Sequence, residues 1–195
     1  MEEILDIYDE NLEICGHKSR CDVHKYGFKH KVVQCYIINE ENREKYVYFQ
    51  QRSFQKDNYP GFYDIACAGH IDSGEEPVNS MVRELEEELG LKVFKSQLIY
   101  SGRKLENKSH NNIIDDEICE LYVLKINHDD FSLGEEVEDI VKAPLREYKR
   151  WINGDINLLK VFSIKYNKTI EVNDKNICYH IKEYNKELIN FIDNL

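Results

Sequence analysis

Three glutamates in the middle of the chain have the type and spacing to hold a metal ion. At about 100° per residue, Glu84, Glu87 and Glu88 fall within an arc of about 100° on one face of a helix. Like charges four residues apart, such as Glu84 and Glu88, destabilise a helix by roughly 0.2–0.5 kcal/mol. A hard divalent cation such as Mg²⁺ or Mn²⁺ prefers oxygen ligands and would remove this repulsion. A solvated acidic face is the alternative that these residues alone leave open.

The neighbouring residues predict the helix that would position these carboxylates. Pro77 suits the first helical position, where a missing N–H costs nothing, and Gly90 suits the left-handed residue that ends a helix. No lysine lies between Pro77 and Leu91, although an ordinary surface helix would intersperse lysines among the glutamates. An apolar stripe at helical spacing lies on a different face and predicts packing against a core: Val78, Met81, Val82, Leu85 and Leu89.

The segment from Gly69 to Leu91 resembles the Nudix box, the sequence motif of the Nudix hydrolase superfamily. Nine positions match at fixed spacing: Gly69, Glu75, Arg83, Glu84, Leu85, Glu87, Glu88, Gly90 and Leu91. The resemblance implies a Nudix fold, in which a mixed sheet lies between helices, with Mg²⁺ or Mn²⁺ held on this loop and helix. It also implies hydrolysis of a diphosphate linked to another group, as in a nucleoside diphosphate derivative or a related small molecule.

The resemblance also assigns a role to each position of the motif. The metal ligands would be Glu84, Glu87, Glu88 and the carbonyl oxygen of Gly69. The structural positions would be Gly90 and an orienting ion pair between Arg83 and Glu75.

Hydrolysis needs a general base near the metal. Many Nudix hydrolases use a glutamate from the loop that corresponds to residues 127–138, so Glu136 is the first choice here and Glu135 the second. The box glutamates Glu84 and Glu87 stay open as alternatives.

Composition limits the partners of the chain. Its 195 residues suffice for one domain, and its net charge of −11 argues against a nucleic-acid polymer or an anionic membrane. A bound metal reverses the local charge, so a small anionic diphosphate remains compatible as substrate. The first residues are acidic and no apolar run approaches the ~20 residues of a transmembrane helix, so we expect a cytoplasmic protein. A homodimer is possible because many relatives are dimers.

The hydrophobic patterns, with the resemblance, predict an α+β fold, a Nudix α/β/α sandwich with a mixed sheet flanked by helices. Strands are expected within residues 4–15 (a hairpin), 31–39, 45–52, 63–68, 92–100 and 113–126, with a polar loop at 106–112. Beyond the box, helices are expected at 144–154 and 177–195. We expect one Nudix domain over 1–195, with a core of about 28–155, an N-terminal hairpin in 1–27 and a C-terminal helical extension in 156–195.

A second resemblance links roughly residues 1–140 to the Nudix branch that includes isopentenyl-diphosphate isomerase. That enzyme uses two N-terminal histidines as metal ligands, and His24 and His30 occupy similar places. Its Cys-Gly-His triplet is similar to residues 68–70, and its Glu-x-Glu strand is similar to residues 115–119. We therefore expect the substrate to contact His70 and Glu117, together with Arg52, whose guanidinium can bind phosphate oxygens bidentately.

One departure from the isomerase pattern favours hydrolysis. The isomerase moves protons with the cysteine of its triplet, but Ala68 occupies that position here and cannot carry a proton. Cys67 is adjacent, but a shift of one residue along a strand turns the side chain to the opposite face. An isomerase-like enzyme and a non-catalytic nucleotide-sensing Nudix domain remain the alternatives.

Overall fold

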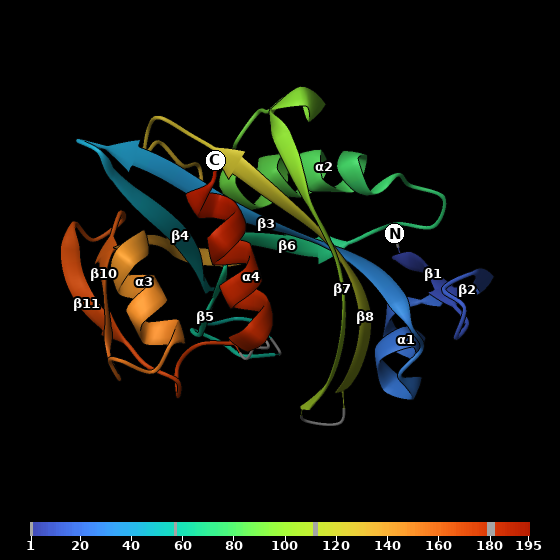
Figure 1. Cartoon of the computed structure of the whole chain (residues 1–195). Coiled ribbons are helices and arrows are strands. Elements are labelled where there is room, and N and C mark those ends of the chain that lie inside the picture. Colours follow the sequence, from blue (N-terminus) through green and yellow to red (C-terminus); the bar gives the residue numbers. More distant parts are fainter. Residues whose placement is uncertain (1, 57, 111–112, 179–181) are drawn as a thin grey trace.

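The computed structural model describes residues 2–56, 58–110, 113–178 and 182–195, and it has the predicted α+β architecture (Figure 1). The described residues form an 11-stranded mixed sheet with helices on both faces. At its centre lies β3 (His30–Glu41), which is antiparallel to β1 (Ile4–Tyr8), β4 (Glu44–Arg52) and β6 (Cys67–His70) and parallel to β8 (Ile113–Lys125). None of the described helices is both long and apolar enough to cross a lipid bilayer.

The other elements extend the sheet or cover it. The remaining strands are β2 (Ile14–Ser19), β5 (Tyr63–Ile65), β7 (Leu98–His110), β9 (Val137–Pro144), β10 (Leu159–Ser163) and β11 (Lys168–Val172). The helices are α1 (Arg20–Tyr26), α2 (Pro77–Leu89), α3 (Leu145–Ile152) and α4 (Lys182–Asp193), and a short 3-10 turn covers Lys95–Gln97.

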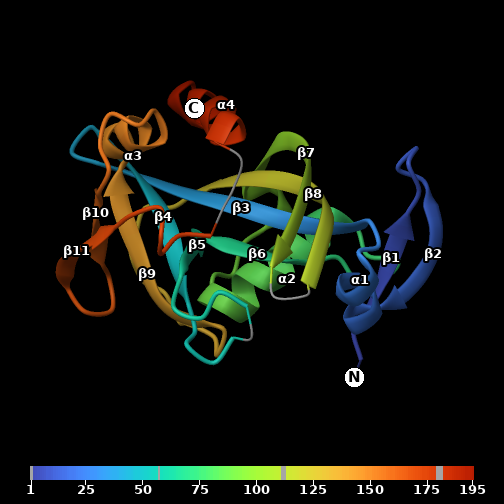
Figure 2. The same ribbon diagram turned by 90° about the horizontal axis from the view of Figure 1, so that it is seen from below.

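Strand β3 separates two hydrophobic cores because its side chains alternate between the faces of the sheet. Tyr36 and Ile38 belong to the core that α3 and α4 cover, whereas Cys35 and Ile37 belong to the core that α2 covers. Two views at right angles show α2 on one side of the sheet and α4 on the other (Figure 2). The predicted sandwich of helices around a mixed sheet is therefore confirmed.

Helix α2 begins and ends at the residues that the sequence predicts. It runs from Pro77 to Leu89, and Gly90 follows in the left-handed conformation with φ of 68°. Its side chains Met81, Leu85 and Leu89 are fully buried. Burial of each such side chain contributes roughly 1.5–3 kcal/mol, so the apolar stripe fixes the rotation of the helix and hence the direction of its glutamates.

The structure differs from the sequence prediction between residues 92 and 112. The predicted strand 92–100 is replaced by the 3-10 turn at 95–97 and the start of β7. Most of the predicted polar loop 106–112 is instead the end of β7, which runs to His110, and residues 111–112 lie outside the described residues. Charged side chains alternate along this strand and pair with each other, so polarity alone wrongly indicated a loop.

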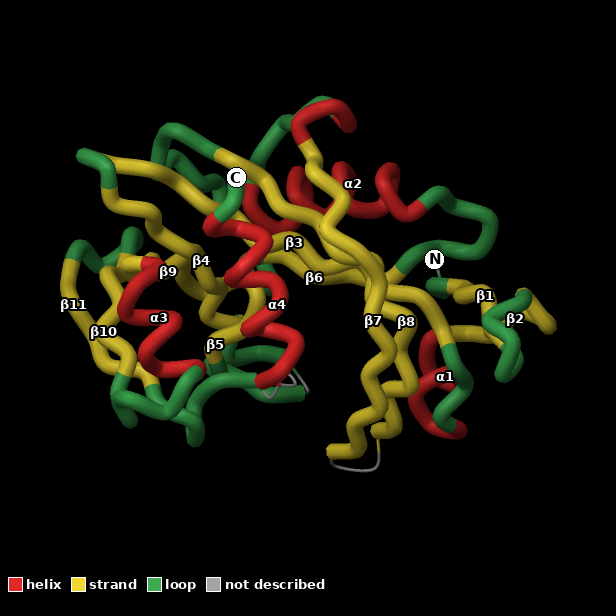
Figure 3. Tube along the Cα trace, viewed as in Figure 1, coloured by secondary structure: helices red, strands yellow, loops and turns green. Residues whose placement is uncertain are grey.

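Two further segments differ from the prediction. The expected strand 63–68 is divided into β5 and β6, which pair with β4 and β3 respectively. The C-terminal region 156–195 was expected to be helical, but the hairpin of β10 and β11 precedes α4 and joins the sheet next to β9. Figure 3 shows this hairpin at the edge of the sheet, with α3 beside it and α4 beyond α3.

A buried polar contact fixes α4 on the sheet. The side-chain oxygen of Asn185 accepts hydrogen bonds from the hydroxyl groups of Tyr36, at 2.9 Å, and Tyr148, at 3.2 Å. Asn185 thus joins β3, α3 and α4 inside an otherwise apolar core.

Replacing Asn185 with alanine leaves both buried hydroxyl groups without this acceptor. We expect Asn185→Ala to lower the free energy of unfolding by about 1–3 kcal/mol, measured by urea denaturation. Asn190→Ala, on the exposed side of the same helix, is the matched control and should change stability by less than about 0.5 kcal/mol. Equal effects of the two substitutions would contradict the role of Asn185.

Candidate active site

A cleft of about 440 Å³ opens over the first half of β3, on the sheet face that carries α3 and α4 further along the strand. Its lining brings together most of the site residues predicted from the sequence: Arg52, Gly69, His70, Arg83, Glu84, Glu87, Glu88, Glu117, Glu135 and Glu136. The predicted residues Glu75 and Gly90 lie behind this lining, where they contact the helix or end it.

Arg83 connects the acidic groups at the α2 side of the cleft. Its Nη1 atom lies 2.6 Å from Glu84 and 3.3 Å from Glu87, and its Nη2 atom lies 3.1 Å from Glu75. Nη2 also donates a hydrogen bond of 3.1 Å to the carbonyl oxygen of His70. The guanidinium therefore sets the spacing between the helix and the end of β6.

Gly69 lies where the Glu84 side chain of α2 packs closely against β6. A Cβ atom at this residue would lie 2.1 Å from Cδ of Glu84, which is impossible without moving the carboxylate. The absence of a side chain therefore lets Glu84 lie directly against the β6 backbone, whose carbonyl oxygen is one of the predicted ligands.

Of the three box glutamates, Glu88 is buried and Glu84 is partly buried. Glu88 is 6% exposed and accepts a hydrogen bond of 3.3 Å from Nε2 of Gln50. Burial, and then the charges of Glu84 and Glu136, raise the pKa of Glu88 to about 8. Burial, and then the charges of Glu87 and Glu136, raise the pKa of Glu84 to about 7, although Arg83 opposes this shift.

These carboxylates fit a divalent cation. Their side chains gather at one edge of the cleft, and burial makes their negative charge costly without a positive partner. The Glu87 side chain is 61% exposed and lies nearer to solvent. A cation bound here would have carboxylate oxygens from Glu84, Glu87 and Glu88 available, which are the ligands that Mg²⁺ and Mn²⁺ prefer.

The acidic loop before β9 is held against α2. The backbone N–H of Ser132 donates to the carbonyl oxygen of Leu89, and that of Gly134 donates to Glu88, both at 2.9 Å. This packing places Glu135 and Glu136 in the lining of the cleft.

The Lys56 ammonium forms an ion pair with the Glu136 carboxylate in the lining of the cleft. Although partial burial opposes it, the hydrogen bond and charge of Lys56 lower the pKa of Glu136. The Glu136 carboxylate is therefore ionised at neutral pH and able to accept a proton. Arg52 and Arg20 also line the cleft, and Arg52 lies 3.4 Å from Asp64, so several cations face an incoming anion.

Three histidines form a second possible metal centre. His24, His30 and His70 each offer one ring nitrogen, and these atoms lie within 4.8 Å of one another. Nε2 of His24 lies 3.2 Å from Nε2 of His70, close to the ~3.3 Å that separates two nitrogens bound to one tetrahedral zinc ion. The buried Nε2 of His30 has no hydrogen-bond partner among the described residues.

The opposite nitrogens of these rings are already held. Nδ1 of His30 contacts the carbonyl oxygen of Phe28 at 3.0 Å, and Nδ1 of His24 contacts that of Arg20 at 2.8 Å. Nδ1 of His70 lies 3.1 Å from the Glu3 carboxylate. Such contacts orient metal-binding imidazoles in proteins, so this cluster fits a transition metal.

The histidine cluster was only partly predicted from the sequence. The resemblance places His24 and His30 where the isomerase has two metal ligands and leaves open whether they bind metal here, whereas it predicts that His70 binds substrate. The register of β3 and β6 brings His70 beside Val32, on the same sheet face as His30, and no local sequence pattern reveals this pairing.

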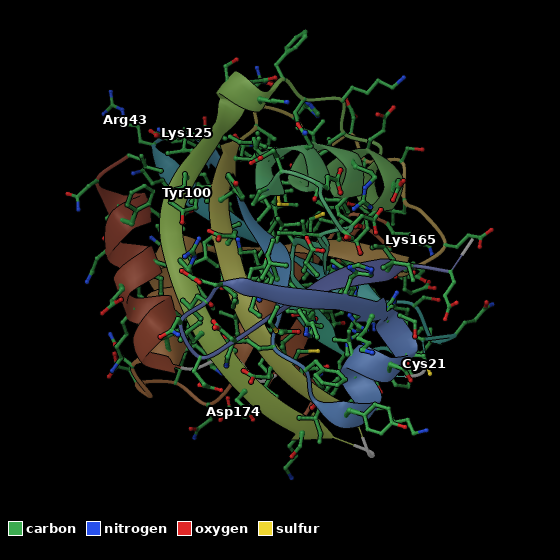
Figure 4. The ribbon with its side chains drawn as sticks, turned by 90° about the vertical axis from the view of Figure 1, so that its right-hand side faces the viewer. Cys21, Arg43, Tyr100, Lys125, Lys165 and Asp174 are labelled. Atoms are coloured by element: carbon green, nitrogen blue, oxygen red, sulfur yellow. The ribbon has the colours of Figure 1, made fainter. Side chains whose placement is uncertain are left out.

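The N-terminal hairpin completes this end of the site. The Asp6 carboxylate accepts hydrogen bonds from the hydroxyl of Ser73, at 2.5 Å, and the N–H of Gly74, at 3.1 Å. These contacts hold the loop that leads into α2. Helix α1, which follows the hairpin, lies against β8 (Figure 4).

The structure also tests the prediction about the two neighbouring residues of β6. Ala68 lines the cleft, whereas Cys67 is fully buried in the core beneath α2. Burial raises the pKa of the Cys67 thiol well above its usual value. The cysteine therefore faces away from the substrate cleft, as the alternation along a strand predicts.

Comparison with known proteins places this fold and site in a family. Residues 28–162 match the NUDIX domain family, and the chain belongs to the Nudix hydrolases. It is 36% identical over 159 residues to an uncharacterized Nudix hydrolase of Clostridium acetobutylicum, covering 80% of this chain and 77% of that protein.

A second related sequence and a solved structure extend the comparison. An isopentenyl-diphosphate Delta-isomerase of Photorhabdus laumondii is 29% identical over 125 residues, covering 64% of this chain and 69% of the isomerase. The crystal structure of DR0079 from Deinococcus radiodurans has the same fold, with a TM-score of 0.58 at 19% identity over 78% of this chain and 90% of that one.

The raised pKa values predict how stability depends on pH without a metal. A carboxyl group whose pKa is higher in the folded state holds its proton until the folded value is reached, so stability falls as pH rises towards that value. With pKa values of about 7 for Glu84 and about 8 for Glu88, the folded chain binds about one more proton than the unfolded chain between pH 7 and 8.

We therefore expect the melting temperature of the metal-free protein to fall by about 3–6 °C between pH 7 and 8, measured in EDTA. His30 and His70, whose pKa values are lowered mainly by burial, affect the slope below this range, near their ordinary value of 6.5. Glu88→Gln should remove most of the decrease. A melting temperature that stays constant or rises between pH 7 and 8 would contradict the raised pKa values of Glu84 and Glu88.

Proposed function

We propose that this protein is a hydrolase that uses Mg²⁺ or Mn²⁺ to cleave a phosphoanhydride bond in a nucleoside diphosphate derivative or a related small diphosphate. The observation that carries the proposal is the pair of carboxylates of Glu84, which is partly buried, and Glu88, which is buried, at the edge of a cleft that also contains several cationic side chains. Membership of the Nudix family supports the same class of reaction.

The proposal assigns a separate task to each group in the cleft. Glu84, Glu87 and Glu88 hold the cation, with the carbonyl oxygen of Gly69 beside them. When bound, the cation neutralises charge on the diphosphate and lowers the pKa of a coordinated water. Arg83 keeps the glutamates in place, and Arg52 and Lys56 attract and orient the phosphate oxygens.

Glu136 is the proposed general base, with Glu135 and the box glutamates as the other candidates. Its lowered pKa keeps it ionised, so it can take a proton from the attacking water. The water oxygen forms a bond to phosphorus, the bridging P–O bond breaks, and a phosphate-containing group leaves. Lys56 must release Glu136, at least in part, to bind phosphate.

The isomerase alternative is not favoured. Ala68 lies in the cleft where the isomerase resemblance requires a cysteine, and Cys67 lies in the core on the other face of the sheet. The thiol of β6 therefore does not line the cleft, which favours hydrolysis.

The metal site of the box can be tested by one substitution in α2. We expect Glu87→Gln to reduce kcat for hydrolysis of nucleoside diphosphate compounds by at least ~10²-fold with Mg²⁺ or Mn²⁺, because an oxygen ligand loses its charge. Phosphate release into solution is the measurement, and EDTA should abolish it. Glu86→Gln, one residue earlier and outside the acidic arc, is the matched control. Near-full activity of Glu87→Gln would refute the assignment.

The histidine cluster supports a proposed site for Zn²⁺ or Mn²⁺, separate from the box glutamates. After loading and dialysis we expect the wild-type protein to retain about one more such ion per chain than His30→Gln, because a buried ring nitrogen is removed. Elemental analysis of metal per chain is the measurement. His17→Gln, on the exposed strand β2, should keep the ion. A folded His30→Gln protein with unchanged metal content would exclude the site.

A further inference from the structure

The cleft has a second polar end, opposite the box glutamates. The sheet neighbours run in the order β6, β3, β8 and β7. At about 4.8 Å between neighbouring strands, β7 lies roughly 14 Å from β6, where α2 packs. If the diphosphate of a substrate binds beside α2, the substituent attached to the diphosphate would lie at the β7 and β8 end of the cleft.

Gln34 lies in the floor of the cleft between these two ends. Its side chain is 3% exposed, and it faces the cleft beside Ala68, its partner in the register of β3 and β6. Its Nε2 atom lies 3.5 Å from Sγ of Cys119, whereas Oε1 has no hydrogen-bond partner among the residues that the structure describes. A buried amide oxygen without a donor is costly, so this atom favours an N–H or O–H group from water or a ligand.

Lys108 supplies a cationic donor at the β7 end. Its ammonium forms an ion pair with Glu106 and lies 3.8 Å from the Glu117 carboxylate. Glu106 is 2% exposed, and its carboxylate lies 3.2 Å from Nζ of Lys104. The buried Glu106 therefore holds Lys108 in place, while Lys108 and Glu117 themselves line the cleft.

This cluster is better suited to hydrogen bonding than to a metal. Glu106, Glu117 and Cys119 have ligand atoms within 4.8 Å of one another. However, Lys104 and Lys108 contact the same carboxylates and balance their charge. A cation would have to displace both ammonium groups, whereas a neutral polar ligand can bond to Lys108 and Glu117 where they lie.

Tyr59 provides an aromatic wall beside these polar groups. It lines the cleft, and its ring lies against Phe62 with 5.4 Å between centroids. Its backbone has φ of 51°, in the left-handed region that bulky residues rarely adopt. Such strain is found at binding sites more often than elsewhere, where the surrounding structure holds it. The tight turn thus directs an aromatic side chain to the same end of the cleft.

We propose that Gln34 and Lys108, with Glu117, form a recognition subsite for a group that presents hydrogen-bond donors and acceptors side by side, as a nucleobase edge or the hydroxyls of a sugar do. The inference rests on the proposed function for the position of the diphosphate. An apolar substituent would displace water from Gln34 and Lys108 without replacing its hydrogen bonds, so the subsite selects against an isoprenoid chain.

Binding of analogues that cannot be hydrolysed tests the subsite independently of catalysis. Calorimetry with the full chain and Mg²⁺ compares methylene-bridged uridine diphosphate with the methylene-bridged analogue of isopentenyl diphosphate. We expect the uridine compound to bind at least about 10²-fold more tightly, because only it can pair with the buried polar groups. Equal binding, or tighter binding of the isopentenyl compound, would overturn the proposal without use of any variant.

Two variants locate the effect. Gln34→Leu should weaken binding of the uridine compound by at least about 10-fold and leave the isopentenyl compound within about twofold. Gln97→Leu, in the exposed turn before β7, is the matched control. Lys108→Met provides a second test should Gln34→Leu not fold. If a folded variant of either residue keeps the wild-type ratio of affinities, the subsite is not where we place it.

Two series of ligands distinguish a base from a sugar. In the first series, methylene-bridged nucleoside diphosphates differ only in the base. If the wild-type protein binds them with different affinities and Gln34→Leu does not, the subsite binds the base. In the second series, the affinity for UDP-glucose is compared with the affinity for UDP. If this difference in affinity is present in the wild-type protein and lost in Gln34→Leu, the subsite binds the sugar. Unchanged discrimination in both series would overturn the proposal. Absence of hydrolysis with this binding pattern intact would instead refute the proposed function alone.

Discussion

The contact between Arg83 and the surrounding carboxylates is the interaction on which the rest of the site depends. One guanidinium joins Glu84 and Glu87 on the helix to Glu75 in the loop and to the backbone of β6. Because an arginine is permanently charged and presents several donors in one plane, it can hold these acidic groups together before any metal binds. The helix, the loop and the strand are therefore fixed relative to one another, and the cleft acquires its acidic edge.

The parts of the site that lie within one local pattern were predicted from the sequence. Pro77, Gly90 and the apolar stripe fixed the limits and rotation of α2, so the positions of its glutamates followed from helical geometry alone. The burial of Glu84 and Glu88 was not predictable in this way, because it depends on β6, on the loop before β9 and on the absence of a side chain at Gly69.

The parts that depend on pairing between distant segments could not be read from the sequence. Lys104, Glu106 and Lys108 made β7 look like a polar loop, since only their alignment with β8 shows that they neutralise one another. His70 joined the histidine cluster through the register of β6 against β3. In both cases a polar residue inside a fold is explained by its partner, and the partner lies far away in the chain.

The N-terminal hairpin has a consequence for how related proteins can differ. The segment that matches the NUDIX family begins at residue 28, yet Glu3, Arg20 and His24 line the cleft and Asp6 fixes the loop before α2. The shared domain thus supplies the acidic edge, and a piece of chain outside it supplies another part of the lining. Exchange of that piece between relatives would alter what the cleft admits while the hydrolytic apparatus stayed the same, so a preserved box is a poor guide to a shared substrate.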